Sequence, residues 1–180
     1  MQLARAYQAL ANDGVLMPVS LHPVDELPKG ERIFTQETVR EVALMLEAAT
    51  SENGTAPKAQ VDQYRVAGKT GTAHRVVNGQ YQDDSYMSLF AGFAPVSDPQ
   101  IVMVVTVNDP QGVDYYGGLV AAPVFSSVMN GALRYRDVAP DAIEKRVNDA
   151  NKEQQDAPRL MISRPPLAVQ ARINKGGDNG

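Results

Sequence analysis

The segment from residue 64 to residue 107 constrains the fold most, because it alternates extended stretches with tight turns. Asn78-Gly79 is a strong signal for a two-residue hairpin turn, since both residue types tolerate a positive φ. Residues 95–99 contain two prolines and mark a second turn, and residues 101–107 are nearly continuous valine, isoleucine and methionine. Such a run is typical of a strand buried on both faces. The pattern predicts strands over 64–76, 86–94 and 101–107, joined as an antiparallel meander.

Helical periodicity precedes this meander. Residues 3–10 carry one apolar stripe, formed by Leu3, Ala6, Tyr7 and Leu10, and Gly14 is a natural end for that helix. A second helix is expected to start near residue 35, with Thr38 and Glu41 as a capping box one turn in. Its expected buried face comprises Val39, Val42, Ala43, Leu46 and Ala49. The small and polar residues 51–58 predict a flexible loop.

A last helix follows the meander, with Pro123 expected in its first turn. Its apolar residues form two neighbouring rows, Val120, Val124 and Val128 in one and Phe125, Met129 and Leu133 in the other. A stripe of this width is typical of a helix that lies on a sheet, so the fold class is α/β (α+β), an antiparallel sheet with packed helices. The apolar periodicity fades after residue 140, which predicts a folded part over residues 1–140 and a variable, disordered tail over residues 141–180.

Composition narrows the possible functions. A net charge of -4 argues against a nucleic-acid-binding protein, which usually carries a basic excess. Cysteine is absent, and the two histidines, His22 and His74, have no partner at ligand spacing, so we expect neither a metal site nor a cofactor. The chain contains no apolar run of membrane-spanning length and no secretory signal.

The stretch from Val66 to Ala73 gathers Lys69, Thr70 and Thr72 between glycines, so it could present hydroxyls, backbone N–H groups and one cation to an anion. One interpretation is a phosphate-binding loop, because Gly68-Lys69-Thr70 matches the end of that motif. The full motif requires a glycine at position 63, where this chain has glutamine, so we reject it. Another interpretation is a polar edge strand whose lysine and threonines discourage aggregation.

A third interpretation rests on resemblance. Lys69-Thr70-Gly71 resembles the Lys-Thr-Gly box of penicillin-recognising serine enzymes. The similarity to class B penicillin-binding proteins extends to residues 2–7, 64–73, 90–95, 108–110, 115–118 and 122–125. Within that family the chain most resembles the division-specific D,D-transpeptidases of Gram-negative bacteria, which cross-link septal peptidoglycan. The resemblance covers residues 1–140 and implies part of a transpeptidase fold, similar to that of serine β-lactamases.

The resemblance also implies roles for single residues. Lys69 would be the catalytic lysine of the box, stabilising negative charge or assisting proton transfer near the serine nucleophile. Thr70 and Thr72 would bind the carboxylate of a terminal D-alanine or of a β-lactam, and Gly71 would let substrate approach the backbone closely. The Thr72 N–H would be an oxyanion-hole donor. Because alternation along a strand places Lys69 and the two threonines on opposite faces, their convergence on one ligand requires an edge strand.

Three further residues are candidate substrate contacts. His74 occupies a position where relatives commonly carry a basic residue, although an exposed residue near the strand end is the simpler interpretation. Tyr115 and Tyr116 could form an apolar wall for substrate, or they could pack the loop against the sheet.

The chain contains no serine followed by lysine three positions later, so the Ser-x-x-Lys nucleophile of the family is not in this sequence. Ser51-Glu52-Asn53 matches Ser-x-Asn literally, but it lies in the expected loop just before the central strand, so we reject it. We therefore expect the C-terminal part of a transpeptidase domain, inactive alone. Its expected partners are the N-terminal part of the same protein, a stem peptide or β-lactam, and divisome proteins, at the periplasmic face of the inner membrane. The alternative is a truncated, non-catalytic interaction module that docks through its apolar edge strand and its tail.

Overall fold

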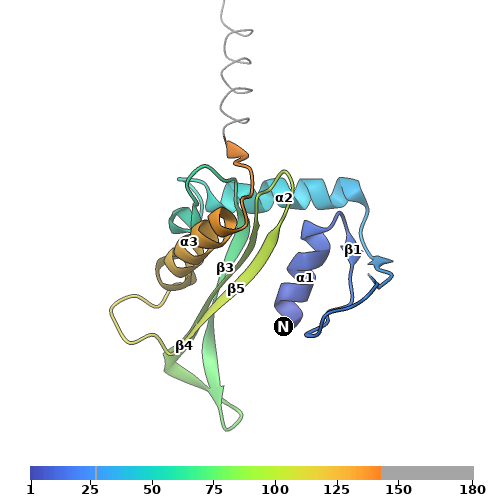
Figure 1. The fold of residues 1–180 in the computed structure, drawn as a ribbon. Helices are drawn as coiled ribbons and strands as arrows, with labels where there is room; N and C mark the ends of the chain where they lie inside the picture. The colour runs from blue at the N-terminus through green and yellow to red at the C-terminus, as the bar shows by residue number, and fades with distance from the viewer. Residues whose placement is uncertain (27, 143–180) are drawn as a thin grey trace, which may run out of the picture.

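The computed structural model describes residues 1–26 and 28–142 (Figure 1). Its elements are α1 (Gln2–Ala11), β1 (Val15–Leu16), β2 (Glu31–Arg32), α2 (Gln36–Thr50), the 3-10 helix η1 (Pro57–Ala59), β3 (Ala67–Val77), β4 (Gln80–Ala94), β5 (Ile101–Asn108) and α3 (Gly117–Tyr135). The predicted tail lies outside the described residues from position 143 onward. Among residues 1–26 and 28–142 no helix is long and apolar enough to cross a bilayer.

The three long strands form an antiparallel sheet in the order β3-β4-β5, which confirms the predicted meander. Asn78 and Gly79 take φ values of 54° and 79°, as a tight hairpin turn between twisted strands requires. The β3–β4 hairpin, or ribbon, extends beyond the end of β5, because the last β4–β5 pair is Met87 with Asn108 (Figure 1). Within the described residues, β3 and β5 are therefore both edge strands.

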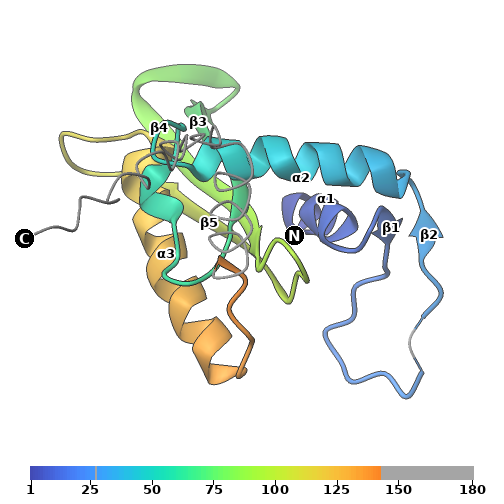
Figure 2. The same cartoon turned by 90° about the horizontal axis from the view of Figure 1, so that it is seen from above.

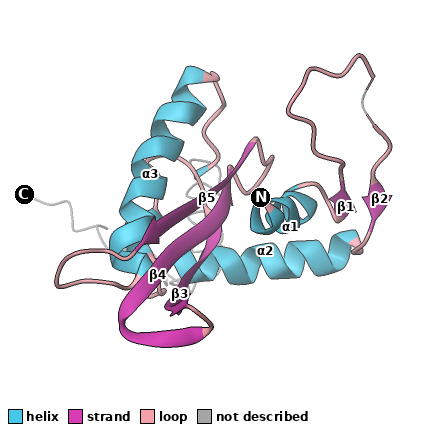
Figure 3. Ribbon diagram, turned by 90° about the horizontal axis from the view of Figure 1, so that it is seen from below, coloured by secondary structure: helices cyan, strands magenta, loops and turns pink. Residues whose placement is uncertain are grey.

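Helices cover both faces of this sheet (Figure 2). On one face α3 contacts all three strands and η1, and on the other α1 contacts β4 and β5 while α2 contacts β3. Figure 3 shows the same layers from below, with α2 running along one side of the molecule. The core lies between the sheet and α3, where the rings of Phe90 and Phe125 meet edge to face at 4.7 Å between centroids. This confirms the predicted mixture of an antiparallel sheet and packed helices.

The burial expected of residues 101–107 is wrong. All of β5 is partly or fully exposed, because it lies at the edge of the sheet and the helices cover it incompletely. Ile101, Met103 and Val105 pack against the core beneath α3. A continuous apolar run does not distinguish an edge strand from a central one, because both of its faces can be apolar in either place.

The first two helices also differ from expectation. In α1 only Ala9 is buried, and Leu3 of the predicted stripe is 39% exposed. In α2 the cap is Thr35, whose Oγ1 accepts a hydrogen bond from the N–H of Thr38 at 3.2 Å, so the predicted box at Thr38 and Glu41 is wrong. Both threonines were suitable caps by residue type, and the helix starts at the earlier one. Of the expected buried face of α2, only Val39 is buried.

The last helix starts earlier than expected, so Pro123 lies inside α3 rather than in its first turn. Phe125, Met129 and Leu133 are fully buried, as predicted. The neighbouring row is only partly covered, with Val124 45% and Val128 51% exposed. The rest of the interface is formed by small residues, Gly117, Gly118, Ala121 and Ala122, all buried. Small residues let the start of α3 approach the sheet closely.

Candidate active site at the free edge of the sheet

The predicted site residues lie on β3, which has no partner on its outer side within the described residues. Burial falls along the strand: Gly68 is buried, Lys69 is exposed, Thr70 and Gly71 are half-buried and Thr72 is exposed. The inner side of β3 pairs with β4, with Thr70 opposite Phe90 and Thr72 opposite Ser88. The edge position that the convergence of Lys69, Thr70 and Thr72 requires is therefore confirmed.

The start of α3 packs directly against this strand. The N–H of Gly117 donates to Thr72 Oγ1 at 3.1 Å. A Cβ at Gly117 would lie 2.3 Å from the carbonyl oxygen of Leu89 and 2.7 Å from that of Gly71. A Cβ at Gly118 would lie 2.5 Å from the carbonyl oxygen of Thr55. Real side chains do not approach backbone atoms so closely, so the two glycines are what lets the helix start beside the threonines.

Lys69 reaches toward the threonine hydroxyls. Its Nζ lies 3.1 Å from Thr70 Oγ1, 3.4 Å from the Thr70 carbonyl oxygen and 3.4 Å from Thr55 Oγ1. None of the ion pairs among residues 1–26 and 28–142 involves Lys69. The ammonium is thus held by long hydrogen bonds to neutral oxygens, and no carboxylate in the described part of the chain forms an ion pair with it.

The two threonines border a cavity of about 370 Å³. Its lining residues are Thr55, Pro57, Lys58, Thr70, Thr72, Tyr116, Gly117, Gly118 and Leu119. Three threonines, one tyrosine, one lysine and the N-terminus of a 19-residue helix therefore border the same space. The helix terminus adds partial positive charge, so the cavity favours an anionic ligand. The described residues contain no cluster of histidine and carboxylate side chains able to hold a metal ion.

The aromatic candidates separate into two groups. Tyr115 stacks on Tyr86 at 4.0 Å between ring centroids, and His74 lies 4.7 Å from the Tyr86 ring on the opposite strand. Tyr116 instead borders the cavity and is 56% exposed. The pKa of Tyr116 is raised by its hydrogen bond with Tyr115, then by the charge of Tyr115 and by slight desolvation. The structure thus brings Tyr116 to Thr70 and Thr72, whereas Tyr115 and His74 do not line the cavity.

His74 is exposed on β3, and its Nδ1 lies 3.1 Å from the carbonyl oxygen of Gln82. This contact holds the ring against the β3–β4 ribbon, away from the cavity. The position agrees with the simpler interpretation of an exposed residue near the end of the strand.

Sequence reasoning missed Thr55 and Lys58, which belong to the segment expected to be a flexible loop. That segment contains η1, whose N-cap Ala56 and last residue Ala59 are both fully buried. The N–H of Ala56 donates to the carbonyl oxygen of Ala49 at 3.0 Å, which ties the segment to the end of α2. The one available signal was Pro57, since proline commonly occupies the first position of a helix.

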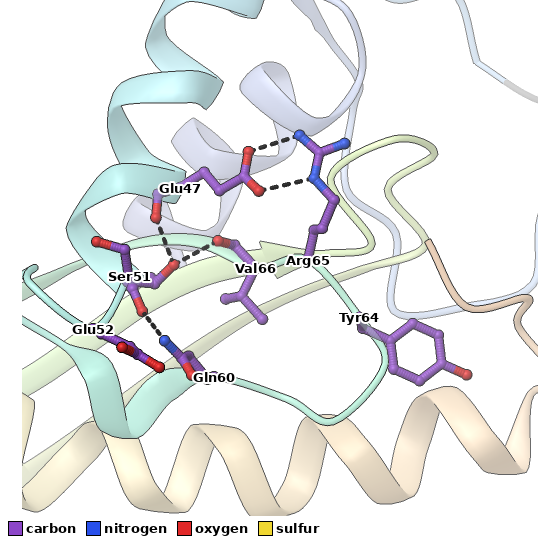
Figure 4. Close-up of a pocket in the computed structure, with 8 residues that line it drawn as sticks. Glu47, Ser51, Glu52, Gln60, Tyr64, Arg65 and Val66 are labelled. Carbon is purple, nitrogen blue, oxygen red and sulfur yellow. Dashed lines mark hydrogen bonds and ion pairs between the residues drawn. The ribbon is translucent and has the colours of Figure 1, made fainter. Parts of the chain in front are cut away.

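A second cavity, of about 270 Å³, lies where α2 ends and β3 begins (Figure 4). Glu47 and Arg65 point toward each other there and form a two-bonded ion pair at 2.6 and 2.8 Å. Thr50 Oγ1 lies 2.9 Å from the carbonyl oxygen of Glu47 and 2.7 Å from that of Val66. These contacts join α2 to the residues just before β3, so this cavity belongs to the support of the site strand.

Comparison with known proteins shows that most of the described chain is similar to one protein family. Residues 1–130 match the family model described as the penicillin binding protein transpeptidase domain. The chain is 44% identical over 140 residues to the probable peptidoglycan D,D-transpeptidase PenA of Neisseria meningitidis (serogroup B). This match covers 78% of this chain and 24% of the relative. The chain is 43% identical over 144 residues to the peptidoglycan D,D-transpeptidase FtsI of Escherichia coli (strain K12), covering 79% and 24%.

A solved structure is also similar, the apo form of the TP domain from Burkholderia pseudomallei penicillin-binding protein 3. It has a TM-score of 0.71 and 45% sequence identity, and the match covers 78% of this chain and 43% of that one. The chain spans about a quarter of the length of the curated relatives given above.

Proposed function

The chain belongs to the transpeptidase-domain family of class B penicillin-binding proteins, and on this basis we propose that it supplies one side of the active site of a peptidoglycan D,D-transpeptidase. This side is the Lys-Thr-Gly wall, residues Lys69 to Thr72. The observation that carries the proposal is that Lys69, Thr70 and Thr72 lie at a free sheet edge, with both threonines bordering a cavity suited to an anion.

The hydrogen bonds of the threonines suit them to bind a carboxylate. A hydroxyl has one proton to donate and two lone pairs that accept. Thr72 Oγ1 accepts from the N–H of Gly117, and Thr70 Oγ1 accepts from the Lys69 ammonium. Both hydroxyl protons therefore remain available to the carboxylate of a terminal D-alanine or of a β-lactam. Gly71, between them, leaves room for the side chain of Leu89, which a Cβ there would approach to 2.9 Å.

In the proposed reaction the serine nucleophile comes from a part of the protein outside this sequence. Its oxygen attacks the carbonyl carbon of the penultimate D-alanine, the terminal D-alanine leaves, and an acyl-enzyme ester remains for the acceptor amine. Lys69 lowers the energy of the negative charge that develops near the nucleophile, and the Thr72 N–H donates to the oxyanion. A pre-organised donor of this kind is typically worth about 3 kcal/mol in the transition state.

Fluorescent penicillin provides the test. We expect no covalent labelling of the isolated chain, because it has no Ser-x-x-Lys, and labelling once the N-terminal half of the domain is joined to it. In the joined protein, Lys69→Ala should lower the acylation rate by about 100-fold or more, as expected for a lost electrostatic contact to the transition state. Lys29→Ala, in the β1–β2 connection, serves as the control. Labelling of the isolated chain, or normal acylation after Lys69→Ala, would contradict the proposal.

A wider setting follows from the same proposal. The relatives include FtsI-type enzymes, so we place the parent protein in septal cell-wall synthesis at the periplasmic face of the inner membrane, with divisome partners and β-lactams as inhibitors.

The partly exposed, apolar β5 edge supports a second candidate function, a non-catalytic module that docks on division proteins. The DNA upstream of Met1 distinguishes the two. An in-frame Ser-x-x-Lys codon pattern favours the enzyme, and a stop codon followed by a start site favours the module.

A further inference from the structure

Lys58 is a lysine to which neither the family motif nor the sequence pattern gives a role. It lies at the centre of η1, between the fully buried Ala56 and Ala59. Two backbone hydrogen bonds fix this turn, from Ala59 N–H to the Ala56 carbonyl at 3.0 Å and from Gln60 N–H to the Pro57 carbonyl at 3.3 Å. The backbone of Lys58 is therefore held in place while its side chain is exposed.

The turn is also held from outside. The side-chain amide of Gln60 donates to the backbone carbonyl of Thr50 at 3.1 Å. Ser126 Oγ of α3 donates to the backbone carbonyl of Gln60. Gly117 and Gly118, at the start of α3, also border the cavity. Both η1 and β3, which carries Thr70 and Thr72, therefore pack on α3. The position of Lys58 relative to Thr70 and Thr72 is thus set by packing rather than by the lysine itself.

Lys58 borders the cavity and, among the described residues, has no ion-pair partner. Lys58 lines the cavity together with Thr55, Thr70 and Thr72. In the part of the chain that the structure describes, the ion pairs are Arg65 with Glu47, Arg75 with Asp109 and Arg134 with Asp62, so Lys58 is in none of them. No carboxylate lines the cavity either.

We propose that Lys58 is a ligand-binding residue of this cavity, a second cation beside Lys69 that selects for ligands carrying a carboxylate at Thr70 and Thr72. This inference rests on the proposed function, because that function identifies the ligand as a terminal D-alanine or a β-lactam. The two lysines belong to different elements. Lys69 is on β3 and contacts Thr70 and Thr55, two residues that line the cavity, whereas Lys58 is on η1 and lines the cavity itself.

The expected contribution follows from Coulomb attraction at an exposed site. A cation several ångströms from a carboxylate near a protein surface changes affinity by roughly three- to tenfold at low ionic strength. Salt should reduce this difference, because the Debye length falls to about 10 Å at 0.1 M and about 3 Å at 1 M. Neutral ligands of the same shape should show no such dependence.

The experiment is a titration of the isotopically labelled chain, joined to the N-terminal half of the domain, with N-acetyl-D-alanyl-D-alanine, following the amide resonances of Thr70, Thr72 and Gly117 by NMR. We expect Lys58→Gln to weaken binding three- to tenfold at low salt, and Lys58→Arg to stay within twofold of the unaltered chain. The C-terminal amide of the same dipeptide should bind both chains equally. Lys29→Gln, which changes net charge by the same amount on a distant segment, should have no effect.

The outcomes separate the two claims. If the dipeptide shifts no resonance of Thr70, Thr72 or Gly117 in the unaltered joined protein, the proposed function is contradicted and the role of Lys58 with it. If these resonances shift but Lys58→Gln binds as tightly as Lys29→Gln, only the role of Lys58 is overturned. An equal loss of affinity for the acid and the amide would also overturn it, because the selection would not depend on the carboxylate.

Discussion

Gly117 is the residue at which the last helix and the site strand come closest. A methyl group there would meet the backbone oxygens of Leu89 and Gly71, which cannot move without shifting β3 and β4. We expect Gly117→Ala to lower the free energy of unfolding by about 1–3 kcal/mol, the usual cost of overpacking. Urea denaturation followed by circular dichroism measures this change.

Gly131 is the matched control on the same helix, since a Cβ there has nothing within 4 Å. Alanine should raise stability at that position by about 0.5–1 kcal/mol, because it is the better helix former. Equal effects of the two substitutions would show that the approach at Gly117 is not tight.

Single residues were predictable where local chemistry alone decides the outcome. Asn78 and Gly79 needed only a turn that accepts positive φ, and they form it. Thr35 and Thr38 offered two caps one turn apart, and residue type alone did not tell which of them begins the helix. Thr55 and Lys58 could not be found in this way, because they reach the cavity only through the packing of η1 on α3.

Among the elements, α2 is joined to the residues just before β3 by the ion pair of Glu47 with Arg65 (Figure 4). Their side chains are only 13% and 22% exposed, so truncating one partner leaves a poorly solvated charge. We expect Glu47→Ala to lower the free energy of unfolding by roughly 1–3 kcal/mol. Thermal and urea unfolding of the variant provide the measurement.

The exposed pair of Arg134 with Asp62, at 3.7 Å, gives the comparison. Asp62→Ala should cost less than about 0.5 kcal/mol, because solvent screens that pair. If Asp62→Ala destabilised the chain as much as Glu47→Ala, the contribution of an ion pair to stability would not depend on its burial here.

The apolar edge of β5 leads to a prediction about solubility. Thr106 is exposed on this strand, so Thr106→Lys should hinder pairing with other chains and raise the temperature at which light scattering begins. Ser127→Lys adds the same charge on the exposed side of α3. If both lysines delayed aggregation equally, net charge rather than the strand edge would be the cause.

The burial of β5 was mispredicted because it depends on the neighbouring elements as well as on the strand's own sequence. Its apolar residues specify a strand, but whether a strand is central depends on what lies beside it. No pattern within residues 101–107 contains that information.

For the whole molecule, Asp141 ties together three segments that are distant in sequence. One carboxylate oxygen accepts from the N–H of Arg65 at 2.7 Å, and the other accepts from Ser97 N–H at 3.1 Å and Ser97 Oγ at 3.0 Å. Asp141 is 5% exposed, so Asp141→Ala would remove three hydrogen bonds to a buried carboxylate and leave the half-buried N–H of Arg65 without its acceptor. We expect a loss of about 2–3 kcal/mol in the free energy of unfolding.

Asp114→Ala, in the exposed loop before α3, should change stability by no more than about 0.5 kcal/mol. If Asp141→Ala unfolded at the same urea concentration as Asp114→Ala, the hydrogen bonds of Asp141 would not contribute to stability as proposed.

The architecture as a whole was largely predictable, because hairpin turns and apolar periods fix which strands pair and which helix packs on them. The convergence at the cavity was predictable for Thr70 and Thr72, which are close in sequence. It was not predictable for η1 or for the start of α3, because these approach β3 only through tertiary packing.

The meander also has a kinetic consequence. Every pairing in the three-stranded sheet joins consecutive strands, and α3 follows directly after the last of them. Closing such short loops costs little chain entropy, so consecutive strands can pair as soon as both have been made. During synthesis, this half of the molecule should therefore assemble soon after α3 leaves the ribosome.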